Sequence, residues 1–110
     1  MKKPKPVTEL QQQRWLQQLA TLLRAGIALH PALSLLNLQG TVSQRVYWQP
    51  VIAGIEQGQG FAETLQGLPG FRRSDVQLLA IAERSGQLDQ QMQRLANWQA
   101  RRIQLHGQLR

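Results

Sequence analysis

The chain has 110 residues, the length of a single domain, and 42% of them are apolar, which is enough to build a buried core. Lysine and arginine number 13 against 6 acidic residues, so the formal net charge is +7 and anionic partners are favoured. The absence of cysteine excludes disulfides, thiolate metal sites and cysteine nucleophiles, and no apolar run approaches the ~20 residues that span a bilayer.

The predicted domain organisation is simple. Residues 1–7 form a basic, proline-containing stretch that we expect to be disordered. Residues 8–110 show helical periodicity throughout and no alternation typical of strands. The sequence therefore predicts one all-α domain.

The first helix has a clear start. Thr8 stands three residues before Gln11, a spacing at which the hydroxyl and the amide can each cap the other's backbone N–H. Apolar residues then recur at helical spacing from Trp15 to Ile27 and predict one buried face. Glutamines such as Gln12 are expected on the opposite, solvent-facing side.

The second and third helices are expected to be separated by a short turn. Pro31 starts the second helix, because a missing N–H costs nothing at the first helical position. Residues 32–38 supply its apolar side chains. Thr41 or Ser43 can cap the third helix, and Pro50 in its interior must either kink it or split it.

A short fourth helix is predicted over residues 61–65, followed by a longer fifth helix. Ser74 and Gln77 repeat the capping-box spacing, so the fifth helix is expected to open there. Residues 76–82 are almost entirely apolar, which predicts that this helix is the central and most buried one.

Two glycines mark joints between helices. Gly26 ends the first helix and Gly86 ends the fifth, where a left-handed backbone lets the chain turn without a side-chain clash. The sixth helix then carries an apolar stripe and a group of arginines. The stripe comprises Leu88, Met92, Leu95, Trp98, Leu105 and Leu109, and the arginines are Arg94, Arg101, Arg102 and Arg110.

The sequence offers little catalytic chemistry. His30 and His106 are far apart, and neither stands four residues from another ligand type on a helix, so surface or capping roles are favoured over metal binding. There is no Gly-Lys-Ser or Gly-Lys-Thr phosphate loop, which argues against ATP hydrolysis. We predict a protein that is not an enzyme and holds no cofactor or metal.

A DNA-binding alternative comes from the region around Gly86. Two helices joined by a glycine turn have the outline of a helix-turn-helix, and the net positive charge fits that function. Against it, the would-be recognition helix opens with residues 87–93, which contain no lysine or arginine and one carboxylate. A basic helix-turn-helix regulator is therefore kept as the alternative function, and nucleic acid is not favoured as a partner.

A second set of residues carries a family resemblance. It comprises Leu-Ala-x-Leu-Leu-x-Ala-Gly-Ile-x-Leu at residues 19–29, a glycine at 58, and Glu-x-Ser-Gly-x-Leu at residues 83–88. In this order the motifs resemble the cytoplasmic domain of the inner-membrane platform proteins of type II secretion systems and type IV pilus machines, the GspF/PilC family. The structural signature positions are Ala25, Gly26, Leu29, Gly58, Glu83, Ser85, Gly86 and Leu88.

The resemblance implies both a fold and a role. The fold is an antiparallel six-helix bundle on the cytoplasmic face of the bacterial inner membrane, reaching the membrane through segments absent from this chain. The implied partners are the secretion or pilus assembly ATPase, other inner-membrane assembly components and a second copy of the chain. Arg94, Arg101, Arg102 and Arg110 are expected to form a partner or membrane-proximal surface.

Glu83 is the signature residue for which the sequence leaves two roles open. A carboxylate at the end of a buried helix is costly unless it is paired or hydrogen-bonded. It either accepts hydrogen bonds from the start of a neighbouring helix, which we favour, or contacts a partner or a cation. Gly60 stands where the family usually has an N-capping serine, and this change is expected to weaken the short fourth helix by about 1 kcal/mol at most.

Overall fold

The computed structural model describes residues 7–108, and all regular secondary structure in this range is helical. The predicted all-α fold with six helices is confirmed. The expected disordered tail, residues 1–7, lies outside this range except for Val7, which packs against the core. The helices are α1 (Glu9–Arg24), α2 (Leu29–Gln39), α3 (Val42–Glu56), α4 (Phe61–Leu65), α5 (Arg73–Arg84) and α6 (Leu88–Gln108).

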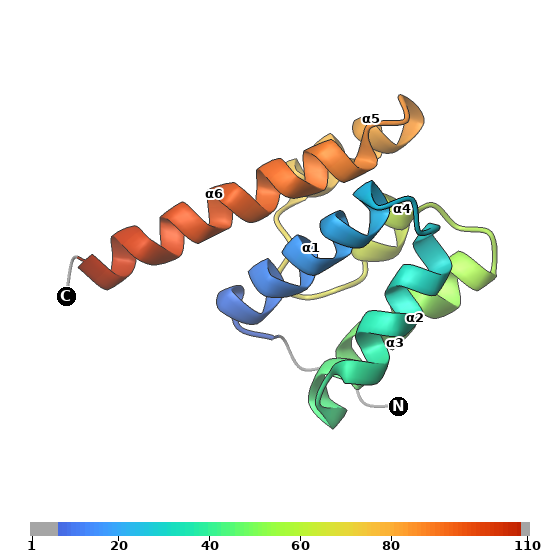
Figure 1. Cartoon of the computed structure of the whole chain (residues 1–110), viewed down its shortest axis with the longest axis horizontal. Helices are drawn as coiled ribbons and strands as arrows, with labels where there is room; N and C mark the ends of the chain where they lie inside the picture. Colours follow the sequence, from blue (N-terminus) through green and yellow to red (C-terminus); the bar gives the residue numbers. More distant parts are fainter. Residues whose placement is uncertain (1–6, 109–110) are drawn as a thin grey trace.

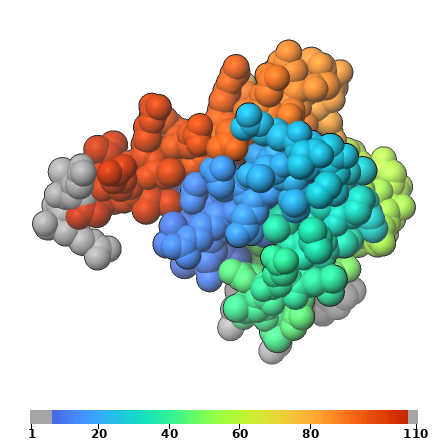
Figure 2. Space-filling model, viewed as in Figure 1, coloured from blue at the N-terminus to red at the C-terminus, as the bar shows by residue number. Residues whose placement is uncertain are grey.

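Helices α1 and α6 lie side by side and run antiparallel (Figure 1). Gln17, in the second half of α1, hydrogen-bonds to Gln93, whereas Glu9 at the start of α1 pairs with Arg102. The turns of α6 that follow Arg102 therefore extend past the beginning of α1, and they project from the rest of the molecule (Figure 2). Helices α2 and α3 form a second antiparallel pair, and α4 connects α3 to α5.

An aromatic cluster occupies the centre of the core. Trp15 of α1 stacks on Trp48 of α3 with ring centroids 3.5 Å apart and planes within 3°. The rings of Tyr47 and Phe71 pack edge-on against Trp48. Because large aromatic side chains bury much apolar surface, this cluster ties α1 and α3 together through their side chains.

Local capping chemistry explains where α1 and α3 begin. Thr8 and Gln11 form the predicted capping box, in which each side chain bonds to the other residue's backbone N–H. Thr41 and Gln44 form the same motif at α3, so Thr41 and not Ser43 is the cap. Both threonines satisfy N–H groups that have no partner inside their helices.

Pro31 lies deeper in its helix than expected, and of the two outcomes considered for Pro50 a split does not occur. Helix α2 begins at Leu29, so Pro31 is its third residue and not its first. The N–H of the third residue also lacks an intrahelical partner, which is why proline is tolerated there. Helix α3 runs without interruption through Pro50, so this proline does not split it.

The predictions for α5 were wrong in two respects. The helix begins at Arg73 after an extended Arg72, and Ser74 makes no capping hydrogen bond. It is also peripheral, with Leu78 49% exposed and Ile81 61% exposed. Its buried residues are Val76, Leu79 and Ala82, so α5 turns one side to the core and the other to solvent.

Candidate functional site

Three joints between helices depend on glycines with left-handed backbone. Gly26, Gly58 and Gly86 have φ values of 93°, 89° and 74°. At each joint the glycine N–H bonds to the carbonyl three residues earlier, and the next N–H bonds to the carbonyl five residues earlier. This is the Schellman motif, which satisfies carbonyls at a helix end and sets the direction in which the chain leaves it.

These three joints lie at the same end of the bundle, which we call the joint end (Figure 1). His30 at the start of α2 bonds to Glu56 at the end of α3, with 3.1 Å between the ring nitrogen and the carboxylate oxygen. Glu83 at the end of α5 bonds to the start of α4. The fold therefore gathers all the signature positions here, namely Ala25, Gly26, Leu29, Gly58, Glu83, Ser85, Gly86 and Leu88.

Glu83 caps α4 from a distance. Its carboxylate accepts hydrogen bonds from the backbone N–H groups of Phe61, at 2.7 Å, and Ala62, at 3.3 Å. This geometry is the first of the two roles considered from the sequence. A Cβ placed on Gly60 would lie 3.1 Å from one carboxylate oxygen of Glu83, so the carboxylate occupies the space that a capping serine would need.

The other signature residues end or connect helices. The hydroxyl of Ser85 bonds to the carbonyls of Ile81 and Ala82, both at 3.2 Å. Leu29 and Leu88 are partly buried and pack against the core, whereas Ala25 is exposed. The signature thus describes how the helices are joined, and its exposed members add small side chains to the surface of the joint end.

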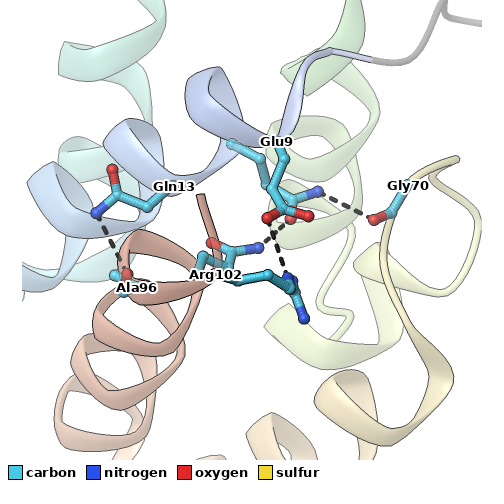
Figure 3. A network of polar contacts seen from close by, with 7 residues as sticks. Glu9, Gln13, Gly70, Ala96 and Arg102 are labelled. Atoms are coloured by element: carbon cyan, nitrogen blue, oxygen red, sulfur yellow. Dashed lines mark hydrogen bonds and ion pairs between the residues drawn. The ribbon is translucent and has the colours of Figure 1, made fainter. Parts of the chain in front are cut away.

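The structure separates the four arginines that the sequence grouped. Arg94 and Arg101 are exposed on α6. Arg102 is largely buried, and its Nε donates to a Glu9 carboxylate oxygen at 3.0 Å (Figure 3). Arg110 lies outside the described residues. Arg102 therefore holds α6 against α1, which leaves Arg94 and Arg101 as the arginines of α6 that face solvent.

A buried network of glutamines was missed by the sequence analysis (Figure 3). Gln12, expected on the solvent side, is only 5% exposed; it donates to the Gly70 carbonyl at 3.3 Å and accepts from Gln99. Gln13 donates to the Ala96 carbonyl at 3.3 Å. An amide can both donate and accept, so it can be buried where both functions find partners. These bonds fix how α1 aligns with α6.

The loop between α4 and α5 is tied to the core through Tyr47. The phenolic O–H donates to the Pro69 carbonyl. Burial raises the pKa of Tyr47 above its ordinary value, and a hydrogen bond with Gln12 opposes this shift in part. The neutral phenol is therefore the form that the folded protein favours.

The histidines and carboxylates do not assemble into a metal-binding cluster in the part of the chain that the structure describes. His30 pairs with Glu56 at the surface, and His106 is exposed near the end of α6. Among residues 7–108, no helix combines the length and the apolar character needed to cross a bilayer.

Comparison with known proteins decides the family. The family model described as "Type II secretion system (T2SS), protein F" matches residues 15–110. The chain belongs to this family. The resemblance expected from the joint motifs is therefore confirmed.

Two curated relatives support the same assignment for this T2SS protein F domain. It is 35% identical over 96 residues to the type 4 fimbrial assembly protein PilC of Pseudomonas putida. It is 36% identical over 95 residues to the type IV pilus assembly protein PilC of Thermus thermophilus. Each alignment covers 86% of this chain but only 24% or 23% of the relative, so the chain spans about a quarter of the length of the relatives it matches.

Proposed function

We propose that this chain is the cytoplasmic domain of an inner-membrane platform protein for type II secretion or type IV pilus assembly. It binds the assembly ATPase and other inner-membrane components, catalyses no reaction itself, and passes mechanical work to pilin or pseudopilin assembly. The observation that carries the proposal is the match over most of the chain to two proteins named for pilus assembly. A second copy of the chain is a further partner in this proposal.

The way the helices are joined supports a role in passing on force. A domain that transmits movement must keep its helices at fixed angles. Schellman motifs close three joints, and the glutamine network holds α1 against α6. Because these bonds restrain the helices relative to one another, a force applied at one end of the domain moves the other end and does not only bend the loops.

We expect the ATPase to contact the joint end. Signature residues from three separate segments are brought together there, and Ala25 and Ser85 among them are exposed. Arg24 and Arg84 are exposed in the last turns of α1 and α5, at the same end. Exposed arginines favour an acidic partner and make the association sensitive to salt.

The test is a binding titration of the chain with its cognate assembly ATPase at low and at physiological salt. Wild-type affinity should fall as the salt concentration rises. The double variant Arg24→Glu/Arg84→Glu should weaken binding by about tenfold or more, because it places like charges opposite an acidic partner. The control Arg14→Glu/Arg45→Glu makes the same change in net charge near the turn between α2 and α3, and it should have a much smaller effect.

Each outcome has a clear meaning. Failure of the wild-type chain to bind the ATPase at low salt would refute the coupling role, and ATP turnover by the isolated chain would refute the non-enzymatic one. Equal losses in the two double variants would remove the joint end as the docking surface. Tight, sequence-specific binding of duplex DNA would revive the helix-turn-helix alternative, although the exposed Gln87 and Gln90 at the start of α6 are poor phosphate ligands.

A further inference from the structure

Helix α6 exposes a narrow stripe that the bundle does not use, which we call the α6 stripe. It consists of Arg94, Trp98, Arg101 and Leu105. Their separations of four, three and four residues place them on one face of the helix. Trp98 is 55% exposed and Leu105 is 58% exposed, whereas Trp15 and Trp48 are buried in the core.

The charge of the α6 stripe is entirely positive. From Gln90 to Gln108 the helix contains no carboxylate. Within residues 7–108 neither Arg94 nor Arg101 forms an ion pair, in contrast to Arg102, which is held by Glu9. The stripe therefore combines two apolar side chains with two cations that have no acidic neighbour on their own helix.

The position and charge of the α6 stripe favour an extended anionic surface over a second copy of the chain as its partner. Arg94, Trp98 and Arg101 lie on the part of α6 that runs beside α1, and Leu105 lies on the turns after Arg102 that project from the rest of the molecule (Figure 2). A second copy placed stripe against stripe would bring four arginines together in a chain that already carries a net charge of +7, so self-association through this face is opposed by repulsion. An extended anionic surface has the complementary charge.

The side-chain chemistry favours a lipid surface among anionic surfaces. Tryptophan concentrates at the boundary between headgroups and acyl chains, where its ring is apolar and its N–H stays hydrated. Leucine can enter the same layer, and arginine can keep its guanidinium on lipid phosphates while its methylene stem lies along apolar surface. A bilayer also accepts a convex helix without needing a preformed groove.

We infer that the α6 stripe binds the surface of an anionic phospholipid bilayer. Trp98 and Leu105 enter the headgroup layer, and Arg94 and Arg101 contact lipid phosphates. This half of α6 then lies along the membrane surface. The inference goes beyond the proposed function, because it requires only this chain and a bilayer and assigns a lipid-binding role to Trp98 and Leu105.

The experiment uses the 110-residue chain with vesicles of phosphatidylglycerol and phosphatidylcholine in equal parts, and with vesicles of phosphatidylcholine alone. Because Trp15 and Trp48 are buried, a blue shift of tryptophan emission on adding vesicles reports on Trp98. We expect the shift, and co-sedimentation, with the anionic vesicles and not with the zwitterionic ones. Trp98→Ala should abolish the shift and weaken co-sedimentation.

Charge variants distinguish binding through the α6 stripe from a nonspecific attraction between the positively charged chain and the anionic vesicles. Each stripe arginine contributes about fivefold to the partition coefficient, so Arg94→Gln/Arg101→Gln should lower it by about 30-fold. The control Arg14→Gln/Arg45→Gln has the same net charge but changes side chains on α1 and α3, so screening should limit its effect to about threefold. All four arginines are exposed, and circular dichroism verifies that each variant folds.

Three results would overturn the inference. They are no binding to anionic vesicles, equal losses in the two arginine variants, and a shift of Trp98 emission with poly-glutamate but not with vesicles. The last result would assign the stripe to an acidic protein. Binding of the ATPase is measured without lipid, so failure of the proposed function and failure of this inference are distinguishable.

Discussion

Replacing Glu83 with alanine removes the cap of α4. Hydrogen bonds to a charged group contribute about 1.5–3 kcal/mol each when they are well formed. The carboxylate makes one short bond, to the Phe61 N–H at 2.7 Å, and one long bond, to the Ala62 N–H at 3.3 Å. We expect Glu83→Ala to lower the free energy of unfolding by about 2–3 kcal/mol, because the second bond adds less than the first.

The sharper test asks whether a local cap can replace the distant one. In the wild-type protein, Gly60→Ser brings a Cβ to 3.1 Å from the Glu83 carboxylate, so it should be neutral or destabilising. In the Glu83→Ala protein that space is empty, and the serine hydroxyl can accept from the first turn of α4. There Gly60→Ser should recover about 0.3–0.5 kcal/mol, a small gain because glycine is itself a tolerated N-cap residue.

Urea unfolding followed by circular dichroism measures all four proteins of this cycle. The coupling energy between the two sites should reach about 0.5 kcal/mol, because Gly60→Ser should stabilise the Glu83→Ala protein and not the wild-type protein. Glu63→Ala removes an exposed carboxylate from α4 itself and serves as the control, with an expected cost of about 0.5 kcal/mol. If Gly60→Ser had the same effect in both backgrounds, the idea that the carboxylate occupies the site of a capping serine would be refuted.

Three further predictions concern single elements. Gly86→Val should lower the unfolding free energy by about 1–2 kcal/mol and with it the melting temperature, because the backbone at Gly86 is left-handed, with a φ of 74°. Gly107→Val, in an exposed helical position, should barely change the melting temperature. Equal effects of the two substitutions would contradict the role given to the Gly86 joint. Thr41→Ala should cost about 1 kcal/mol in urea unfolding, whereas Ser74→Ala should cost nothing measurable, because only the threonine caps a helix. Burial raises the pKa of Tyr47, so the stability due to the neutral phenol is fully present below the ordinary tyrosine pKa and is lost as pH rises through the folded-state pKa. Tyrosinate absorbance follows this residue alone, since it is the single tyrosine of the chain. Tyr47→Phe should remove this loss of stability at alkaline pH.

Features set within a few residues could be predicted from the sequence. The capping box at Thr8 and the glycine joints at Gly26 and Gly86 depend on groups three to five residues apart, and the structure contains them as expected. The exception is Ser74, where the same spacing does not make a cap. There the helix already begins at Arg73 after an extended Arg72, so Ser74 lies inside the first turn and not in front of it.

Burial was harder to predict, because it depends on which elements come to cover a face. The apolar pattern of α2 includes Leu38, which is 74% exposed, while the polar Gln12 is buried among the partners of α1. Periodicity ranks side chains by polarity, and it does not reveal that an amide can satisfy both of its functions inside a core. Within the signature, the motif pointed to Glu83, but its partner is 22 residues away, at Phe61.

The long-range cap changes how the joint end holds together. A helix of five residues such as α4 has too few internal bonds to be stable alone. Its first N–H groups depend on the last turn of α5, and α5 ends in the Schellman motif of Gly86 that directs the chain into α6. Helix α6 is in turn held along α1 as far as Arg102. A continuous set of bonds therefore leads from α4 at the joint end to the projecting turns of α6, which is the mechanical connection that the proposed platform role requires.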